Sequence, residues 1–125
     1  MLFLSKQEII YIHQQLINQF GGIHGLRDES ALESALAAAE NRAYYENAGL
    51  AACAATYAWH LSQAHAFLDG NKRIAAAAAE IFLEINGAKL NAENEQLVDL
   101  FLNIAAGMLS RTEVESWFVE HFSSY

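Results

Sequence analysis

The chain has 125 residues, of which 54% are hydrophobic and 18% charged, and this composition suits one domain over residues 1–125 with a single buried core. Its formal net charge of −8 argues against direct nucleic-acid binding, because proteins that bind nucleic acids usually present a basic face to the phosphates. No apolar run approaches the roughly 20 residues that span a bilayer, so we expect a cytoplasmic protein that does not enter a membrane.

The N-terminal part of the sequence predicts a helix followed by a loop. Apolar residues recur at helical spacing over residues 5–20. Ser5 and Glu8 have the spacing of a capping box, in which each side chain satisfies a backbone N–H at the start of the helix. Three glycines within residues 21–28 then predict a loop.

Two further helices are predicted before the middle of the chain. Asp28 or Ser30 can cap a helix over residues 29–43. Residues 44–49 fit either a loop or a short extended flap. The alanine-rich segment from about residue 48 to 66 is too continuously apolar for a surface helix, so it is predicted to be the central helix of the fold.

The C-terminal half predicts three more helices, from Gly70 or Asn71 to Asn86, over 91–108 and over 112–122. Gly87 is expected to end the first of them, because glycine readily takes the left-handed conformation found just after helices. Thr112 and Glu115 have the spacing of another capping box. The sequence therefore predicts an all-α, compact single-domain bundle of about six helices.

The stretch HAFLDGNKR, from His65 to Arg73, concentrates polar groups at one helix start. A helix N-terminus carries unpaired N–H groups and the positive end of the helix dipole, although the dipole alone favours an anion by only ~0.3–1 kcal/mol. Gly70 allows an anion to approach the backbone, and Lys72 and Arg73 add full positive charges. This turn is therefore a candidate phosphate-binding site.

Two residues of the stretch have both a structural and a chemical interpretation. Asp69 fits an N-cap, and it also fits a Mg²⁺ ligand, since Mg²⁺ is typically held by one or two carboxylates together with substrate phosphates. His65 fits a surface or C-capping residue. Beside bound phosphate it also fits a general base, because imidazoles ordinarily titrate near pH 6.5.

The same stretch resembles the HxFx(D/E)GN(G/K)R signature of the Fic/Doc superfamily, whose members transfer part of a nucleoside triphosphate to a protein hydroxyl. The resemblance extends over nearly the whole chain and is closest to the death-on-curing (Doc) branch. The other segments that carry it are FGGIHGLRD, LESAL and EIFLEINGAKL, together with the central helix before the signature. The resemblance implies one Fic/Doc-like domain that uses ATP with Mg²⁺.

The resemblance also implies a role for each matching residue. His65 takes the proton from the target hydroxyl, and Phe67 anchors the loop in the core. Asp69 orients Mg²⁺ or the attacking group, and Arg73 holds a phosphate. Gly70, Asn71 and Lys72 form the anion hole, in which Asn71 also fixes the loop.

Two departures from the AMP-transferring members favour phosphoryl transfer. Those members typically read GNGRxxR, whereas this chain has Lys72 in place of the second glycine and Ala76 in place of the second arginine. Lysine is a flexible point charge and arginine a bidentate fork, so a different phosphorus is expected to face the nucleophile. Gly70 matches the AMP-transferring form, which leaves AMP transfer as the alternative.

The Doc branch further implies a toxin of a type II toxin–antitoxin system that phosphorylates a protein such as a translation elongation factor. Some Fic/Doc members restrain themselves with an internal helix of signature (S/T)xxxE(G/N), and the chain contains no match to it. We therefore expect control by a cognate antitoxin whose C-terminal segment folds as a helix into a groove.

Other functions need separate consideration. His60 and His65 are five residues apart, which does not match the helical zinc motif with its spacing of four and adjacent glutamate. A non-catalytic helical binding module, in which the signature serves only as a cap and packing element, remains an alternative. The histidines without a partner nearby in sequence are interpreted as structural or exposed; they are His13, His24 and His121.

Overall fold

The computed structural model describes residues 1–125 and contains six helices and two short strands. The helices are α1 (Lys6–Phe20), α2 (Glu29–Glu46), α3 (Leu50–Ala64), α4 (Asn71–Ile85), α5 (Asn94–Ala105) and α6 (Arg111–His121). The strands are β1 (Ala88–Leu90) and β2 (Phe122–Ser124). The predicted all-α bundle is therefore confirmed, and no helix has the length and apolar character needed to cross a membrane.

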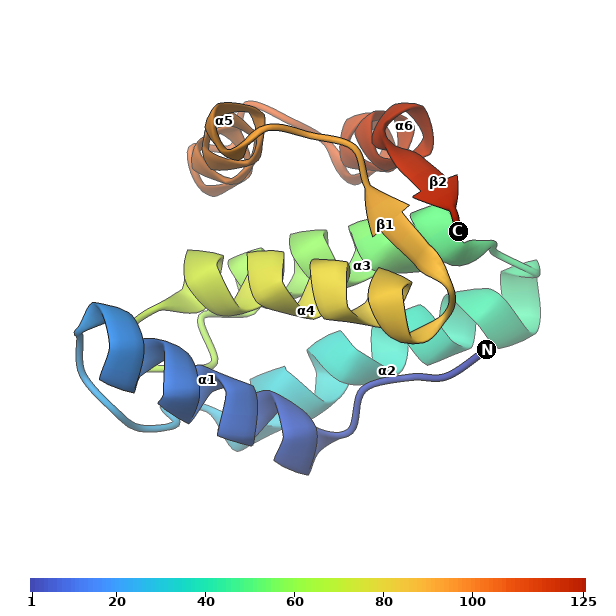
Figure 1. The fold of residues 1–125 in the computed structure, drawn as a ribbon. Helices are drawn as coiled ribbons and strands as arrows, with labels where there is room; N and C mark the ends of the chain where they lie inside the picture. The colour runs from blue at the N-terminus through green and yellow to red at the C-terminus, as the bar shows by residue number, and fades with distance from the viewer.

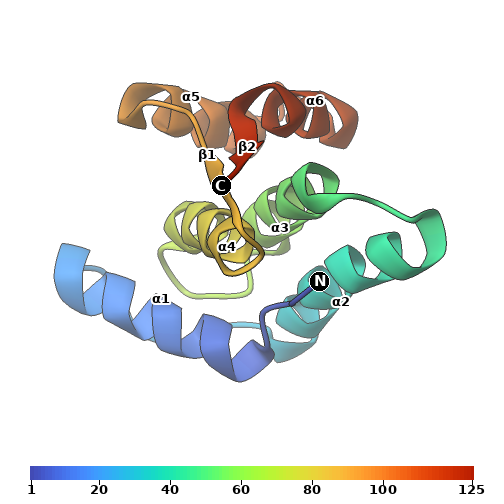
Figure 2. The same ribbon diagram turned by 45° about the vertical axis from the view of Figure 1, so that its right-hand side comes forward.

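Helices α3 and α4 form the middle of the molecule, with α1 and α2 on one side and α5 and α6 on the other (Figure 1; Figure 2). Both middle helices bury alanine, namely Ala54, Ala55 and Ala58 on α3 and Ala75, Ala78 and Ala79 on α4. Small side chains let two helix backbones approach closely. The predicted central helix is therefore α3, and α4 packs closely against it.

Two helix starts are formed as the sequence predicts. Ser5 and Glu8 make both hydrogen bonds of a capping box at the start of α1. Asp28 is the N-cap of α2, and its Oδ1 accepts a hydrogen bond from the backbone N–H of Ala31 at 3.0 Å. Both starts could be predicted because each cap residue and its partner are three residues apart.

The predicted capping box at the start of α6 is wrong. The box is formed by Ser110 and Glu113, two residues before the predicted Thr112 and Glu115. Glu115 instead accepts a hydrogen bond from Nη1 of Arg42 on α2, at 2.9 Å. This ion pair joins two helices that are distant in sequence, so local spacing could not reveal it.

The short flap considered for residues 44–49 is also wrong. Tyr44 and Tyr45 belong to the last turn of α2, and Asn47 ends that helix in the left-handed conformation with φ 57°. This turn precedes α3, whereas His65 follows its other end, which is about 22 Å away along a helix of 15 residues. The tyrosines therefore do not lie beside the signature.

Both chain termini are attached near the end of α4. The two strands pair antiparallel, with Ala88 opposite Ser124. The N-terminal segment is held by two hydrogen bonds between the backbone of Leu2 and the side-chain amide of Asn86, at 2.7 and 2.8 Å. Neither attachment was predicted, because each joins short segments that are far apart in sequence.

Candidate active site

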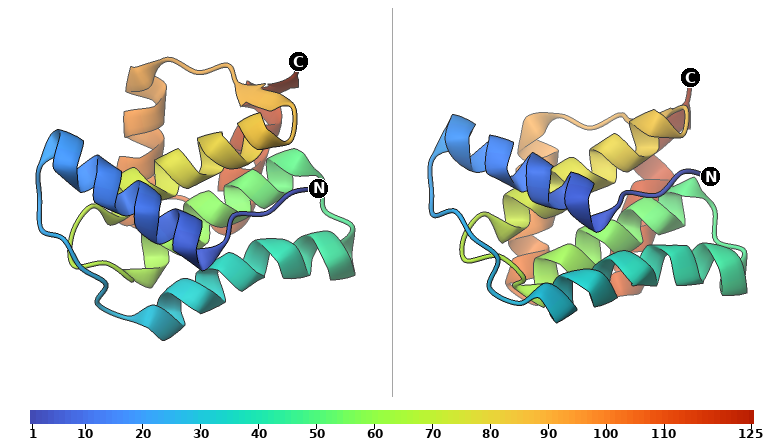
Figure 3. Two further views of the ribbon diagram at one scale, coloured as in Figure 1. Left: turned by 60° about the horizontal axis from the view of Figure 1, so that its bottom comes forward. Right: turned by 90° about the horizontal axis from the view of Figure 1, so that it is seen from below.

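The signature begins in the loop between α3 and α4, which we call the motif loop (residues 65–70), and ends at Arg73 in the first turn of α4. A second loop, the glycine loop (residues 21–28), lies at the same end of the bundle (Figure 3). Leu26 and Phe67 form an antiparallel β-bridge between the loops. The backbone N–H of Leu68 also donates to the carbonyl of Gly25, at 3.0 Å. The motif loop is therefore held in place by a segment that precedes it by about 40 residues.

His65 ends α3 in the left-handed conformation, with φ 47° and ψ 43°. This conformation is unfavourable for residues other than glycine by roughly 1–2 kcal/mol. Its carbonyl oxygen accepts a hydrogen bond from Nε of Arg27 in the glycine loop, at 2.7 Å. The residue is exposed, and its imidazole makes no hydrogen bond within the chain. Both ring nitrogens are thus available for proton transfer.

Phe67 and Asn71 hold the middle of the motif loop. Phe67 is buried in the core. The Asn71 side chain accepts a hydrogen bond from the backbone N–H of Phe67 at 3.1 Å and donates one to its carbonyl at 2.9 Å. Because one amide group satisfies both backbone groups, Asn71 fixes the loop against the start of α4.

The carboxylate of Asp69 is oriented by two backbone amides. Ile23 N–H donates to Oδ2 at 3.1 Å, and Gly70 N–H donates to Oδ1 at 2.8 Å. The hydrogen bond from Ile23 is the largest cause of a lowered Asp69 pKa, followed by that from Gly70, with a smaller contribution from the charge of Arg73. Asp69 is therefore a carboxylate at neutral pH. A Cβ on Gly22 would lie 2.7 Å from Oδ2, so a side chain there would push the carboxylate from this position.

The first turn of α4 leaves backbone donors unpaired. The first hydrogen bond of this helix runs from Ile74 N–H to the carbonyl of Gly70, so the amides of residues 71–73 have no helical acceptor. Gly70 has φ 75°, a conformation that suits glycine. Lys72 is exposed and forms no ion pair. This turn therefore combines free N–H groups with a free positive charge.

Arg73 connects this turn to the end of α1. Its Nη1 donates to the carbonyl of Gly21 at 3.0 Å, and its guanidinium lies 5.5 Å from the ring centroid of Phe20. Both contacts are compatible with an anion on the other side of the guanidinium, because this group has five N–H donors.

All six predicted site residues line one cavity of about 420 Å³. Its lining comprises Ser62, His65, Leu68, Asp69, Gly70, Asn71, Lys72, Arg73 and Ala105. Ser62 was not predicted; it lies one turn before His65, and its buried hydroxyl has no hydrogen-bond partner. A base, a carboxylate and two cations beside free amides form a set of groups that can bind a phosphorylated substrate and move a proton.

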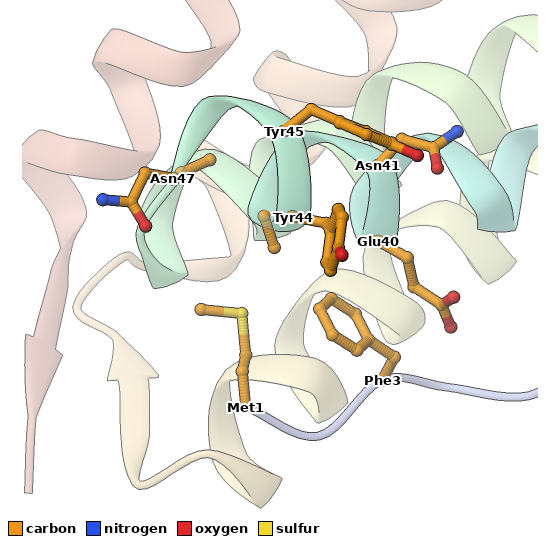
Figure 4. Close-up of a pocket in the computed structure, with 9 residues that line it drawn as sticks. Met1, Phe3, Glu40, Asn41, Tyr44, Tyr45 and Asn47 are labelled. Carbon is orange, nitrogen blue, oxygen red and sulfur yellow. The ribbon is translucent and has the colours of Figure 1, made fainter.

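A larger cavity of about 720 Å³ lies at the opposite end of α3 (Figure 4). Tyr44 and Tyr45 from α2 lie on one side of it, and Met1 and Phe3 on the other. Its single charged side chain is the carboxylate of Glu40, which would repel phosphate. The cavity at the motif loop is the smaller of the two, and it is the candidate active site because of the charged side chains that line it.

Two further histidines clarify the site. His13 is 2% exposed, and its Nε2 lies 2.7 Å from the carbonyl oxygen of Asp69, 56 residues along the chain. It was predicted to be structural or exposed because it has no partner nearby in sequence. His60 does not line the cavity, and burial is the main cause of its lowered pKa. His13 is therefore a neighbour of the site through its contact with the motif loop, whereas His60 takes no part in it.

A model of one protein family, described as the Fic/DOC family, matches residues 3–83. The chain belongs to the Fic/DOC family. The matched residues include α1, the glycine loop, the motif loop and most of α4, so the family match covers every residue that lines the cavity except Ala105.

Two relatives illustrate this Fic/DOC assignment. The chain is 33% identical over 115 residues to the protein kinase doc of Escherichia phage P1, an alignment that covers 91% of this chain and 90% of that protein. It is 42% identical over 76 residues to toxin Doc of Mycolicibacterium smegmatis, covering 59% of this chain and 58% of that protein. The resemblance to the Doc branch is thereby confirmed.

Proposed function

We propose that this chain is the toxin of a toxin–antitoxin system and transfers a phosphoryl group from ATP to a hydroxyl group of a protein, such as a translation elongation factor. The observation that carries the proposal is the arrangement of His65, Asp69 and the first turn of α4 around one cavity. The names of the two relatives, a protein kinase and a toxin, support it.

His65 acts as the general base in this proposal. Its exposed imidazole takes the proton from a Ser, Thr or Tyr hydroxyl of the target. The hydroxyl oxygen attacks the γ-phosphorus, the bond from this phosphorus to the bridging oxygen of the β-phosphate breaks, and ADP leaves with the electron pair. The hydrogen bond from Arg27 to the His65 carbonyl supports this role, because it fixes the backbone that carries the base.

The phosphates lie against the first turn of α4 in this proposal. The free amides of Asn71 and Lys72 and the ammonium group of Lys72 face the phosphate oxygens, and Arg73 contributes its guanidinium. The N–H of Gly70 already donates to Asp69. Gly70 therefore contributes by having no side chain, which lets the phosphates approach the backbone. In this proposal the first turn of α4 binds the phosphates in the conformation that it already has, with no movement of α4.

Asp69 is the residue that would hold Mg²⁺. It is the one acidic residue that lines the cavity, and each of its oxygens accepts only one hydrogen bond, which leaves lone pairs on both. One carboxylate together with substrate phosphates is a typical ligand set for this ion. Bound there, Mg²⁺ would neutralise charge on the phosphate oxygens.

The choice of the γ-phosphorus rests on Lys72 and Ala76. Ala76 occupies the position of the second arginine of AMP-transferring members, and it lies one turn along α4 from Lys72. A single flexible ammonium group therefore replaces a rigid guanidinium near the phosphates. AMP transfer by the same site is the second candidate, which Gly70 favours because it matches the AMP-transferring signature.

We further propose that the antitoxin covers a groove beside the site. Two adjoining cavities of about 230 and 670 Å³ lie along α4 and share Arg73, Ala76, Leu97 and Val98. Val98 is 56% exposed and Leu102 is 50% exposed. The groove thus has an apolar middle, with Lys72 and Arg73 at the end near the site and the carboxylates of Glu80 and Glu84 farther along α4. This pattern suits the amphipathic C-terminal helix of an antitoxin, whose apolar face would cover Leu97 and Val98.

The proposal is tested by incubating the chain with cell extract and ATP labelled at either the α- or the γ-phosphate. We expect γ-label, and no α-label, on a protein of the extract. Label from the α-phosphate would establish AMP transfer. No label from either position, in an extract of a host whose growth the chain arrests, would favour the non-catalytic binding module.

The toxin assignment is tested by expression. We expect growth arrest by the chain alone, normal growth with the His65→Ala variant, and recovery when the antitoxin gene is expressed with the toxin. Binding should also raise the melting temperature of the toxin by mass action. A harmless chain in a host that has a suitable target and lacks the antitoxin would contradict the assignment.

A further inference from the structure

One buried histidine on α1 contacts the motif loop at two residues and lies close to a third. His13 is stacked on Phe67, its Nε2 is 2.7 Å from the carbonyl oxygen of Asp69, and the same nitrogen lies 3.5 Å from where a Cβ of Gly70 would be. These contacts reach both the anchor of the loop and the turn that binds the anion. No other residue of α1 makes a side-chain hydrogen bond to the motif loop.

The direction of the hydrogen bond follows from its acceptor. A carbonyl oxygen can only accept, so Nε2 of His13 carries the proton and donates to Asp69. The same peptide unit continues into the Gly70 N–H, which donates to the Asp69 carboxylate. The imidazole of His13 therefore holds the carbonyl of the Asp69–Gly70 peptide bond, and the N–H of the same peptide bond orients the Asp69 carboxylate.

The stack fixes the imidazole itself. The ring centroids of His13 and Phe67 are 3.8 Å apart, with an angle of 13° between the planes. Phe67 is in turn held by both hydrogen bonds of Asn71. The imidazole thus has one defined position, from which its donor meets the Asp69 carbonyl.

We infer that His13 is a positioning residue that sets the place of the Asp69 carboxylate and of the Gly70 turn. The inference rests on the proposed function, because only transfer from ATP requires Asp69 and the anion turn to meet the same substrate. A displacement of about 1 Å in such a group lowers a rate by up to roughly a hundredfold. His13 touches neither substrate, and acts through the motif loop.

Two variants of His13 test separately its aromatic ring and its N–H donor. His13→Phe keeps a ring to stack on Phe67 and removes the donor. His13→Gln removes the ring and keeps an N–H donor at the same distance from the backbone. We expect kcat to fall at least about tenfold in His13→Phe, with KM for ATP changed less than about threefold, and to fall less in His13→Gln. Ile9→Val, on the same buried face of α1, controls for general loosening of the helix.

Hydrogen exchange gives a second measurement that does not depend on activity. The amides of Ile23 and Gly70 donate to Asp69, so both should exchange at least about tenfold faster in His13→Phe than in the unsubstituted chain. In Ile9→Val their exchange rates should stay unchanged. An unchanged kcat together with unchanged protection of both amides in His13→Phe would overturn the inference. If the unsubstituted chain transfers no label, the proposed function fails, and the exchange of these two amides still tests the positioning.

The unsubstituted chain provides a measurement that needs no variant. The hydrogen bond requires a proton on Nε2 of His13, which nitrogen–proton NMR correlation of the imidazole detects. A neutral ring protonated only on Nδ1 would overturn the inference, even if every variant of His13 failed to fold.

Discussion

Nε of Arg27 donates a hydrogen bond to the carbonyl oxygen of His65 at 2.7 Å, across 38 residues of sequence. His65 is in the left-handed conformation, and its carbonyl is near the C-terminal end of α3, where a cation is favoured. Arg27 therefore stabilises the backbone geometry that presents the imidazole to the cavity.

Replacing Arg27 by methionine should slow the reaction more than it weakens the fold. The side chain is exposed, so little packing is lost, but the His65 carbonyl loses a charge-assisted donor. We expect about a tenfold fall in kcat/KM for transfer from ATP, with a melting temperature within a few degrees of the original. Arg111→Met, on α6, is the matched control. Equal activity of the two variants would show that the contact does not position His65.

Replacing His65 by glycine and by alanine should separate stability from activity. Both variants lose the imidazole that is proposed to act as the general base, so transfer should fall about 10²- to 10⁴-fold. Glycine takes φ 47° without strain, whereas alanine does not. We therefore expect His65→Gly to be more stable than His65→Ala by roughly 1 kcal/mol in urea unfolding. Equal stability would mean that the left-handed conformation is absent in solution.

Replacing Gly22 by alanine should displace the Asp69 carboxylate. The added Cβ would lie 2.7 Å from Oδ2, whereas a Cβ on Gly21 has no neighbour within 4 Å. Both glycines have positive φ, so Gly21→Ala controls for backbone strain. We expect transfer to fall roughly a hundredfold in Gly22→Ala and much less in Gly21→Ala. The comparison is made by single-turnover kinetics at saturating ATP, where equal losses would contradict a steric effect on Asp69.

Much of the fold and of the site could be predicted because the signals are local. The capping box of Ser5 and the signature from His65 to Arg73 each lie within one short segment. The contacts that give the signature its geometry are not local. His13 and Arg27 reach the motif loop only after the bundle has folded. Arg27 lies in the segment FGGIHGLRD that carries the family resemblance, but neither residue has a neighbour in sequence that indicates its contact.

The two wrong predictions both concern the ends of helices. Thr112 and Ser110 both match a capping box, and the structure forms the one at Ser110, whereas Glu115 pairs with Arg42. The flap, considered as one alternative to a loop at residues 44–49, is excluded up to Glu46, because α2 continues until Asn47 takes the left-handed conformation. In both cases the local pattern allowed two answers and did not distinguish them.

Glu80 should make the stability of the protein depend on pH. Burial, and secondly the charge of Glu84, raise its pKa in the folded state above the ordinary 4.5. The folded state therefore holds this proton more tightly than the unfolded state, and stability falls as pH rises from about 4.5 through the raised value. We expect Glu80→Gln to raise the melting temperature at pH 7, and the gain to vanish at about pH 3. Glu84→Gln should give a smaller gain, and a constant gain at all pH values would contradict this origin.

The pairing of the glycine loop with the motif loop also has a consequence for protein synthesis. His65 and Asp69 take their places only when α1 and the later motif loop have both left the ribosome and met. The core around α3 is completed by Val114 and Phe118 of α6, which are fully buried and follow the motif loop by more than 40 residues. A chain that has left the ribosome only as far as the motif loop therefore lacks part of the core that holds α3, so we expect the site to reach its final geometry only after α6 has also been made.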